Sequence, residues 1–217
     1  MTLKSIALLA ATAALAAFAV PLAAERIADS AEDIRPVLLG STVPDTVLAD
    51  LDGSPVRLRE AVAGRLTALV FYRGGWCPYC NLQLADLRHI SADLEALGFT
   101  LVAITPDQPS ELRKTVDKNE LDYQLLSDTG AATMRGFGIA FRVDAPTTRR
   151  YQDYGIDLDA ASGDSHHALP VPAVFLIDAQ GVVRFSYVDP DYTRRTPAAV
   201  ILAAARAVRE QSDKLQR

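Results

Sequence analysis

Cys77 and Cys80 are the residues of this chain best suited to chemistry, and the chain has no other cysteine. A dithiol at this spacing can close into a disulfide within one helical turn. Its thiolate attacks a disulfide or a peroxide when its pKa is lowered into the working range. The pair follows an apolar run at 66–71, and a strand leading into a helix would place Cys77 where unpaired N–H groups and the helix dipole favour a negative sulfur. Pro78 suits the first helical position, so redox chemistry is the leading interpretation.

A structural zinc site and a purely structural disulfide are the alternatives for this pair. Zinc needs about four ligands, usually a second pair of Cys or His at metal spacing. The remaining candidates are His89, on the polar face of the next helix, and the adjacent His166 and His167 in a polar stretch. A disulfide across so short a loop removes little chain entropy and stabilises little. Neither alternative explains the pair as well as redox function, and we expect no bound metal or cofactor.

The first 24 residues have the pattern of a secretory signal peptide. Lys4 supplies the positive start, residues 6–20 form an Ala- and Leu-rich apolar core, and Leu22-Ala23-Ala24 offers small residues for cleavage. An uncleaved signal anchor is the alternative. Either outcome places the folded part outside the cytoplasm, which in a bacterium means the periplasm, where a dithiol must be actively reduced.

The 193 residues after the signal suit one domain, which we place at 41–217 behind a leader at 25–40. They contain 21 basic and 27 acidic residues, a net charge of −6. This mild acidity gives no reason to expect a nucleic acid or an anionic membrane as a partner.

Hydrophobic periodicity and turn residues predict the order of helices and strands. A hairpin around Asp52-Gly53 comes first, and the helix that begins at the cysteines is expected to continue to about Leu97. The stretch 147–170 is polar and predicts a long loop. The expected strands are 46–49, 55–58, 66–71, 99–104, 123–126, 173–178 and 182–188, and the further helices are 59–63, 110–119, 128–137 and 197–211. Parallel strands with right-handed crossovers and a terminal hairpin predict an α/β fold with a central mixed sheet and helices on both faces.

This order of elements, with Trp76-Cys77-Pro78-Tyr79-Cys80 opening the first main helix, resembles the thioredoxin fold. Within that superfamily the segments 40–58 and 71–84 resemble the peroxiredoxin-like branch of the alkyl hydroperoxide reductase and thiol-specific antioxidant family. Segments 125–128 and 174–178, with Gly181, add to the likeness. The resemblance implies a thiol-dependent antioxidant enzyme that reduces peroxides and is recycled by an external thiol such as a thioredoxin-like protein. It is also compatible with a homodimer.

Aligned with the family pattern, Cys80 takes the position of the peroxidatic cysteine, Cys77 replaces a threonine and Arg73 replaces a proline. The family's peroxide-binding arginine corresponds to Pro172. Thioredoxin-like dithiol proteins have a cis-proline there, packed against the cysteines, so the Val171-Pro172 bond is a candidate for the cis isomer.

Two mechanisms follow from the resemblance. In the peroxidase interpretation the Cys80 thiolate attacks the peroxide and Cys77 resolves the sulfenic acid into a disulfide, with Arg73 or Arg142 standing in for the absent arginine. In the exchange interpretation Cys77, expected to be the more exposed cysteine, attacks a protein disulfide while Pro172 orients the substrate chain. We favour the peroxidase.

A third hypothesis, of a different class, is a secreted binding protein that merely retains the redox fold; it predicts no loss of activity on Cys→Ser substitution.

The remaining candidate residues each have a structural alternative. Trp76 shapes the rim of the site or simply packs, and Arg73, followed by two glycines, points at the thiolate or into solvent. The stretch 147–170 forms a lid or partner contact, or else a solvated loop. Asp191-Tyr192 with Arg194 and Arg195 resembles the family, and we assign it no catalytic role. The lid candidates are Tyr151, Tyr154, His166 and His167.

Overall fold

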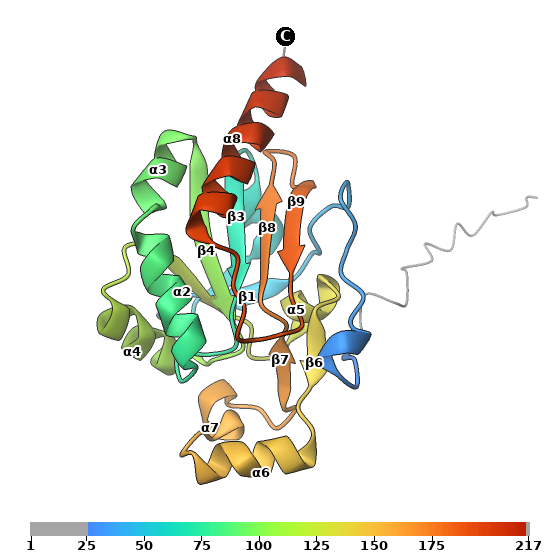
Figure 1. Ribbon diagram of the computed structural model, residues 1–217, viewed down its shortest axis with the longest axis vertical. Helices are drawn as coiled ribbons and strands as arrows, with labels where there is room; N and C mark the ends of the chain where they lie inside the picture. Colours follow the sequence, from blue (N-terminus) through green and yellow to red (C-terminus); the bar gives the residue numbers. More distant parts are fainter. Residues whose placement is uncertain (1–25, 216–217) are drawn as a thin grey trace, which may run out of the picture.

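A computed structural model describes residues 26–215, so the expected signal peptide at 1–24 and residue 25 lie outside the described residues. Within 26–215 a seven-stranded mixed sheet has the order β2-β1-β5-β4-β3-β8-β9, and β6 pairs with β7 in a separate ladder (Figure 1). β3, β4 and β5 run parallel, and β8 lies antiparallel to β3. The predicted fold class is confirmed. The strands are β1 (Val47–Ala49), β2 (Pro55–Arg57), β3 (Leu66–Phe71), β4 (Phe99–Thr105), β5 (Gln124–Ser127), β6 (Ala140–Arg142), β7 (Ala168–Pro170), β8 (Ala173–Ile177) and β9 (Val183–Val188).

Helices cover both faces of the sheet because its central strands are apolar on both faces. Every residue of β3 is buried. Leu69 and Phe71 pack on one side with α1 and α5, whereas Ala68 and Val70 pack on the other with α2, α3 and α8, as the two-residue period of a strand requires. Figure 1 shows α2, α3 and α8 on this second face. The helices are α1 (Leu58–Val62), α2 (Pro78–Arg88), α3 (Ser91–Ala96), α4 (Pro109–Asn119), α5 (Ala132–Gly136), α6 (Ala145–Asp153), α7 (Leu158–Ser162) and α8 (Ala198–Leu215).

The helix after the cysteines is shorter than the sequence predicted. It ends at Arg88, and a second helix begins at Ser91 instead of the first continuing to Leu97. The Ser91 hydroxyl donates to the Arg88 carbonyl at 2.9 Å, an acceptor that a continuous helix would offer to the N–H of residue 92. The apolar period nevertheless continues, so Leu87 and Leu94 both reach the same core.

The prediction of a long loop over 147–170 is wrong, because this stretch contains most of α6, all of α7 and the whole of β7. Asp144 caps α6 by accepting from the Thr147 N–H at 2.6 Å, and Asp157 caps α7 through Ala160 at 3.0 Å. Both helices are short and bury only one or two residues each, so they lack the apolar stripe that would have revealed them. Figure 1 shows α6 and α7 together as a projection next to β6 and β7.

The leader over 26–40 has little regular structure but is attached to the domain. Its one helical piece is a 3₁₀ turn at Ala31–Asp33. The Ala28 N–H donates to the Ala140 carbonyl at 2.9 Å, and the Arg35 N–H donates to the Gly138 carbonyl at 3.0 Å. Backbone hydrogen bonds therefore hold residues 26–40 along the start of β6.

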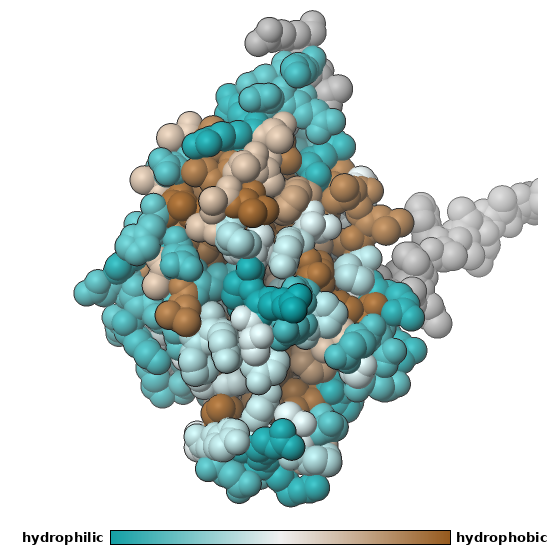
Figure 2. Space-filling model, viewed as in Figure 1, coloured by the Kyte–Doolittle hydropathy of each residue, from teal (hydrophilic) through white to brown (hydrophobic). Residues whose placement is uncertain are grey.

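The surface is mixed in character. In Figure 2 hydrophobic side chains gather over the region of α3 and α8, and hydrophilic ones cover most of the projecting α6 and α7. Among residues 26–215, no helix is both long and apolar enough to cross a membrane.

Candidate active site

The cysteine pair lies where β3 gives way to α2. Cys77 is the N-cap of α2 in an extended conformation, and Pro78 is its first residue, as the sequence predicted. The Cys77 carbonyl accepts from the N–H groups of Cys80 and Asn81, each at 3.1 Å, and the Asn81 side chain donates to the Gly75 carbonyl at 2.8 Å. These bonds fix both sulfurs against the first turn of the helix. Both cysteines are free thiols.

Both sulfurs are buried, and Cys77, the cysteine expected to be the more exposed, is only marginally so. Cys77 is 1 % exposed and Cys80 is 0 % exposed, and both belong to an apolar cluster with Tyr72 and Leu84. The segment that precedes α8 lies against the α2 start, since Tyr192 makes an edge contact with Tyr79 at 5.9 Å between ring centroids. A reactant must therefore pass a covering layer of side chains to reach either thiol.

Arg195, to which we assigned no catalytic role from the sequence, is part of this layer. Its Nη2 lies 3.2 Å from the Cys80 sulfur and 3.9 Å from the Cys77 sulfur. Its Nη1 donates to the Tyr192 carbonyl and, at 2.8 Å, to the Arg194 carbonyl. The Nε atom is buried and has no hydrogen-bond partner among the described residues. One guanidinium thus contacts both thiols and still has a free donor.

Arg73 is buried beside the pair, so the alternative of a solvated surface arginine is wrong. It is only 3 % exposed. Three aromatic rings surround the guanidinium carbon, with centroids at 4.2 Å for Tyr192, 5.2 Å for Trp76 and 5.5 Å for Tyr151, and Nη2 donates to the Tyr151 hydroxyl. Arg142, the other proposed stand-in, instead donates to the His166 carbonyl at 2.8 Å.

The two thiols have opposite electrostatic environments. A hydrogen bond from Cys80 lowers the pKa of Cys77 to about 6, with help from the positive charges of Arg73 and Arg195. Burial raises the pKa of Cys80, and the negative charge on Cys77 adds to this effect. At neutral pH the pair therefore holds one proton and one negative charge. The sulfur that bears this charge at rest is Cys77, whereas the family alignment gives the peroxidatic position to Cys80.

Asp107, a residue that the sequence analysis did not single out, binds the backbone of the turn that precedes Cys77. It follows β4, is 2 % exposed, and accepts from the Gly75 N–H at 2.7 Å. Burial raises its pKa to about 7, while the Gly75 N–H opposes the shift. A carboxylate two residues after the end of a buried parallel strand was the signal that could have revealed it.

The two other predicted site residues lie near the cysteines. Trp76 is half-buried and packs on Tyr151 at 5.7 Å between ring centroids. Pro172 lines a cavity of about 250 Å³ together with Arg73, Tyr151 and Tyr192. The Val171-Pro172 bond, a candidate for the cis isomer, is trans, as is every peptide bond in 26–215. The Val171 N–H donates to the Ile139 carbonyl at 2.9 Å, and this bond holds the chain extended into β8.

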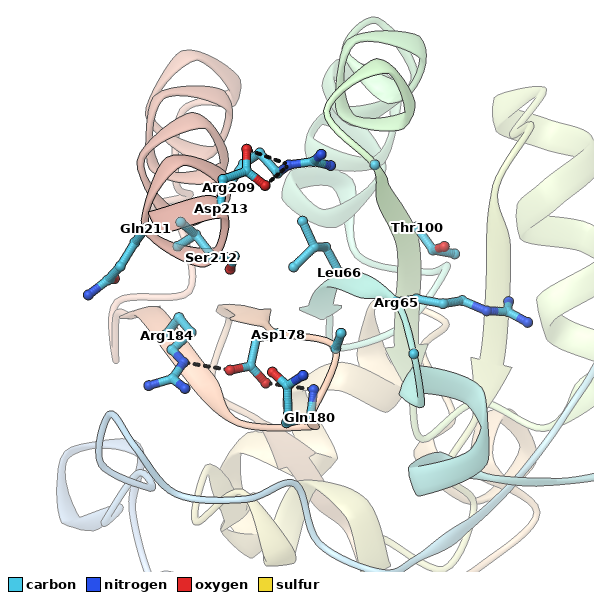
Figure 3. A pocket seen from close by; sticks show the side chains of 14 residues that line it. Arg65, Leu66, Thr100, Asp178, Gln180, Arg184, Arg209, Gln211, Ser212 and Asp213 are labelled. Atoms are coloured by element: carbon cyan, nitrogen blue, oxygen red, sulfur yellow. Dashed lines mark hydrogen bonds and ion pairs between the residues drawn. The ribbon is translucent and has the colours of Figure 1, made fainter. Parts of the chain in front are cut away.

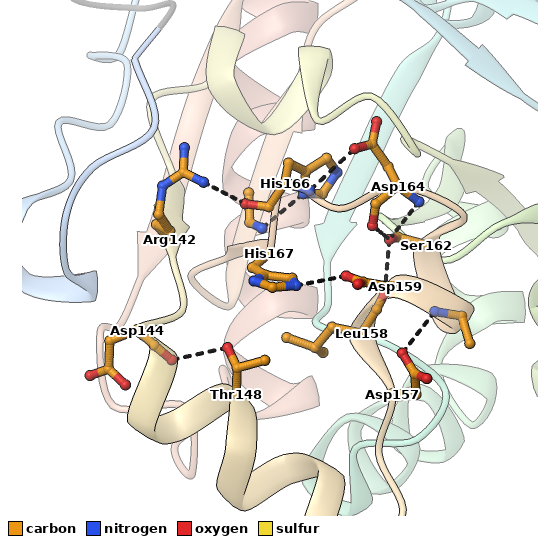
Figure 4. A network of polar contacts seen from close by, with 12 residues as sticks. Arg142, Asp144, Thr148, Asp157, Leu158, Asp159, Ser162, Asp164, His166 and His167 are labelled. Atoms are coloured by element: carbon orange, nitrogen blue, oxygen red, sulfur yellow. Dashed lines mark hydrogen bonds and ion pairs between the residues drawn. The ribbon is translucent and has the colours of Figure 1, made fainter.

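The two histidines of the projection bind the protein's own groups, as Figure 4 shows. The His166 ring accepts from the Ala168 N–H at 2.8 Å, so its Nε2 carries hydrogen and donates to the Thr129 carbonyl at 2.7 Å. His167 pairs with Asp159 at 2.7 Å. This histidine cluster, comprising His166, His167 and Asp159, fastens α7 to the domain.

A larger hollow lies away from the cysteines. It has a volume of about 490 Å³ and lies between α8 and the start of β3 (Figure 3). Two ion pairs, Arg184 with Asp178 at 2.7 Å and Arg209 with Asp213 at 3.0 Å, involve four of its charged side chains, and Arg65 also lines it. No cysteine lines it, so we place the redox site at the β3–α2 turn instead.

Residues 39–186 match the AhpC/TSA family. The putative peroxiredoxin bcp of Haemophilus influenzae is 29% identical over 106 residues, which are 49% of this chain and 68% of that protein. The chloroplastic peroxiredoxin Q of Arabidopsis thaliana is 26% identical over 148 residues, 68% of this chain and 58% of that protein. Among solved structures, peroxidoxin BcpB from Mycobacterium tuberculosis has a TM-score of 0.60 at 23% identity, covering 78% of this chain and 97% of that one.

A buried dithiol at the start of the first main helix, on a sheet of this order, defines a thioredoxin-fold oxidoreductase. The family match covers well over half of the chain, so the chain belongs to the AhpC/TSA family, and its relatives are peroxiredoxins. It is a peroxiredoxin-like thiol peroxidase. The hypothesis of a binding protein without redox activity is therefore set aside.

Proposed function

We propose that this protein reduces peroxides with Cys80 as the attacking sulfur and Cys77 as the resolving one. The Cys80 sulfur bonds to one peroxide oxygen as the O–O bond breaks, and the other oxygen leaves as hydroxide and is protonated to water. Cys77 then attacks the sulfenic acid of Cys80, a disulfide forms, and the second oxygen also leaves as water. An external dithiol supplies two electrons and two protons to restore the pair.

The resting charge must move before Cys80 can attack. The two thiols share one proton, and its transfer from Cys80 to Cys77 leaves Cys80 anionic and Cys77 neutral. Arg195 favours this form because its Nη2 is closer to Cys80, at 3.2 Å, than to Cys77, at 3.9 Å. The pair thus uses its one negative charge for the attack and keeps its one proton, now on Cys77.

The burial of both sulfurs is the observation that carries the choice of peroxide as substrate. At 1 % and 0 % exposure neither thiol presents a surface on which an extended polypeptide could lie. A peroxide has only two oxygens to admit, and the 250 Å³ cavity beside Arg73 and Tyr192 lies next to this layer of side chains.

The reductant and the compartment complete the proposal. The family implies a thiol reductant, and we assign a thioredoxin-like protein outside the cytoplasm, because the first 24 residues have the pattern of a secretory signal. In a bacterial periplasm the disulfide form would accumulate unless such a reductant is present. Association into a homodimer stays a prediction.

Thiol–disulfide exchange with protein substrates is a second candidate, and one observation favours it. The lowered pKa of Cys77, about 6, makes this sulfur the resting nucleophile. Exchange would require the segment at 189–196 to move as a whole, since Cys77 is covered.

Stopped-flow peroxide consumption and insulin reduction by the wild type, Cys77→Ser and Cys80→Ser distinguish the candidates. Peroxidase chemistry predicts that only Cys80→Ser abolishes the first reaction with peroxide. A mixed disulfide trapped by Cys80→Ser and not by Cys77→Ser supports exchange instead. Peroxide consumption by the wild type no faster than by a free thiol contradicts the proposed function.

A further inference from the structure

We propose that Arg195 is the catalytic arginine of this peroxidase, holding the attacking sulfur with Nη2 and binding a peroxide oxygen with Nε. This inference rests on the proposed function and adds to it the group that brings the peroxide to the sulfur. The position where the family resemblance implies that arginine is Pro172 in this chain. Arg195 reaches the sulfurs from a different segment, directly before α8.

The geometry of the guanidinium group supplies two parallel donors on one edge. In arginine, the Nε–H and one Nη2–H point the same way from a rigid plane, and such a fork can bind two acceptors side by side. Nη2 already contacts the Cys80 sulfur at 3.2 Å. Nε is buried with no partner among the described residues, a state that costs free energy unless an acceptor binds there. A peroxide oxygen beside the sulfur is an acceptor of the right size.

The other nitrogen keeps the group in place. Nη1 donates to the carbonyls of Tyr192 and Arg194, so the guanidinium is held by the backbone of its own segment. This anchoring leaves the Nε/Nη2 edge directed at the sulfurs. Preorganised donors of this kind stabilise charge as it develops, here on the oxygen that leaves when the O–O bond breaks.

The two arginines suggested by the sequence do not place a guanidinium nitrogen on a sulfur, although the Arg73 Nε is also buried with no partner among the described residues. The Arg73 guanidinium is surrounded by three aromatic rings and donates to the Tyr151 hydroxyl. It therefore acts on the thiols through its positive charge and makes no side-chain hydrogen bond to them. Arg142 is bound to the His166 carbonyl. Within residues 26–215, Arg195 is the arginine whose side chain lies within hydrogen-bonding distance of the sulfurs.

In the proposed step the peroxide lies against the Nε–H of Arg195 with its near oxygen facing Cys80. The sulfur donates an electron pair to the near oxygen, the S–O bond forms and the O–O bond breaks. The far oxygen takes the electron pair and then a proton to become water, so the sulfur is oxidised and the peroxide reduced.

The test compares Arg195→Met and Arg195→Lys with Arg194→Met as the matched control. Arg194 is exposed, pairs with Asp191 at 3.2 Å, and has no recorded side-chain contact with the sulfurs. Each reduced protein is mixed with hydrogen peroxide and, separately, with iodoacetamide across a pH series. The thiolate fraction is followed by ultraviolet absorbance, and rates are expressed per thiolate. Thermal unfolding checks that each variant is folded.

We expect Arg195→Met to react with peroxide about 10- to 100-fold more slowly per thiolate than Arg194→Met, the range of one hydrogen bond to a charged group. Its reaction with iodoacetamide per thiolate should change by less than about threefold, because that reaction does not need the two parallel N–H donors of Arg195. Arg195→Lys keeps the positive charge without a second parallel donor, so it should keep more of the thiolate and remain at least about tenfold slower with peroxide.

Three results would overturn the inference while leaving the peroxidase intact. Arg195→Met could match Arg194→Met, Arg195→Lys could match the wild type per thiolate, or peroxide and iodoacetamide could lose rate equally. The last two would reduce Arg195 to a point charge that ionises the thiol. A wild type no faster than a free thiol would instead contradict the proposed function itself.

Discussion

The cysteine site and the histidine cluster are both polar groups embedded in this fold, but only the first leaves its groups unsatisfied. In the histidine cluster the His166 ring has both nitrogens bonded and His167 pairs with Asp159. At the cysteine site Nε of Arg195 has no partner, and the pKa values of Cys77 and Asp107 are shifted toward neutrality. An unpartnered buried donor and shifted pKa values are therefore typical of the reactive site, whereas satisfied hydrogen bonds are typical of the structural one.

Gly75→Ala breaks the cysteine site and should have the largest effect. An added Cβ would collide with the Thr115 Oγ1, which is fixed by donating to the Glu111 carbonyl at 3.0 Å. Displacing the turn by about 1 Å should slow the reaction with peroxide about 100-fold. Stopped-flow kinetics measure this loss.

Gly130→Ala is the matched control for that collision, since nothing lies within 4 Å of its added Cβ, and it should react like the wild type. Combining Gly75→Ala with Thr115→Ala removes the colliding oxygen and should restore part of the rate. A Gly75→Ala protein with full activity would show that the turn does not set the geometry of the pair.

Asp107→Asn sharpens the comparison through pH. The pKa of Asp107 is raised to about 7, so the folded state binds its proton more tightly than the unfolded state, and the wild type loses stability as pH rises from about 4 to 7. The variant lacks this loss, and its free energy of unfolding relative to the wild type should rise by about 2–4 kcal/mol across that window. Urea unfolding at several pH values measures the difference. Parallel curves for the two proteins would contradict the assignment.

His166→Ala tests the other side of the comparison and should have the smallest effect. The variant loses the hydrogen bonds to Thr129 and Ala168, and we expect a loss of about 1–3 kcal/mol in the free energy of unfolding. Peroxide consumption should stay within about twofold of the wild type, since the ring touches neither sulfur. A strong loss of activity in a stable protein would move the cluster into the reactive site.

The spacing of apolar and turn residues along the chain was enough to predict some of the strands and helices. The strand, turn and helix around the cysteines and the terminal hairpin were all present in the sequence as apolar runs with turn residues between them. Arg195 was not, because it lies 115 residues from Cys80 in the chain and reaches it only through the packing of the segment before α8. The helices α6 and α7 were missed because capped, exposed helices lack an apolar stripe.

Two features of the site are not specified by the motif, namely the trans bond before Pro172 and the nearly complete burial of Cys77. Both depend on what other segments place around the residue, such as the Ile139 carbonyl that binds Val171 and the cover over the α2 start. A motif specifies which atoms are present and their order. It does not specify what lies over them.

The direct test of the shared charge is an ultraviolet titration of the reduced wild-type protein, with the peroxide rate measured on the same samples. A single thiolate should appear with a midpoint near pH 6, the second should ionise only far above it, and the peroxide rate should rise with the first. If both thiols ionise together near the ordinary cysteine pKa of about 8.5 and the peroxide rate follows them, the two cysteines do not share one charge at neutral pH.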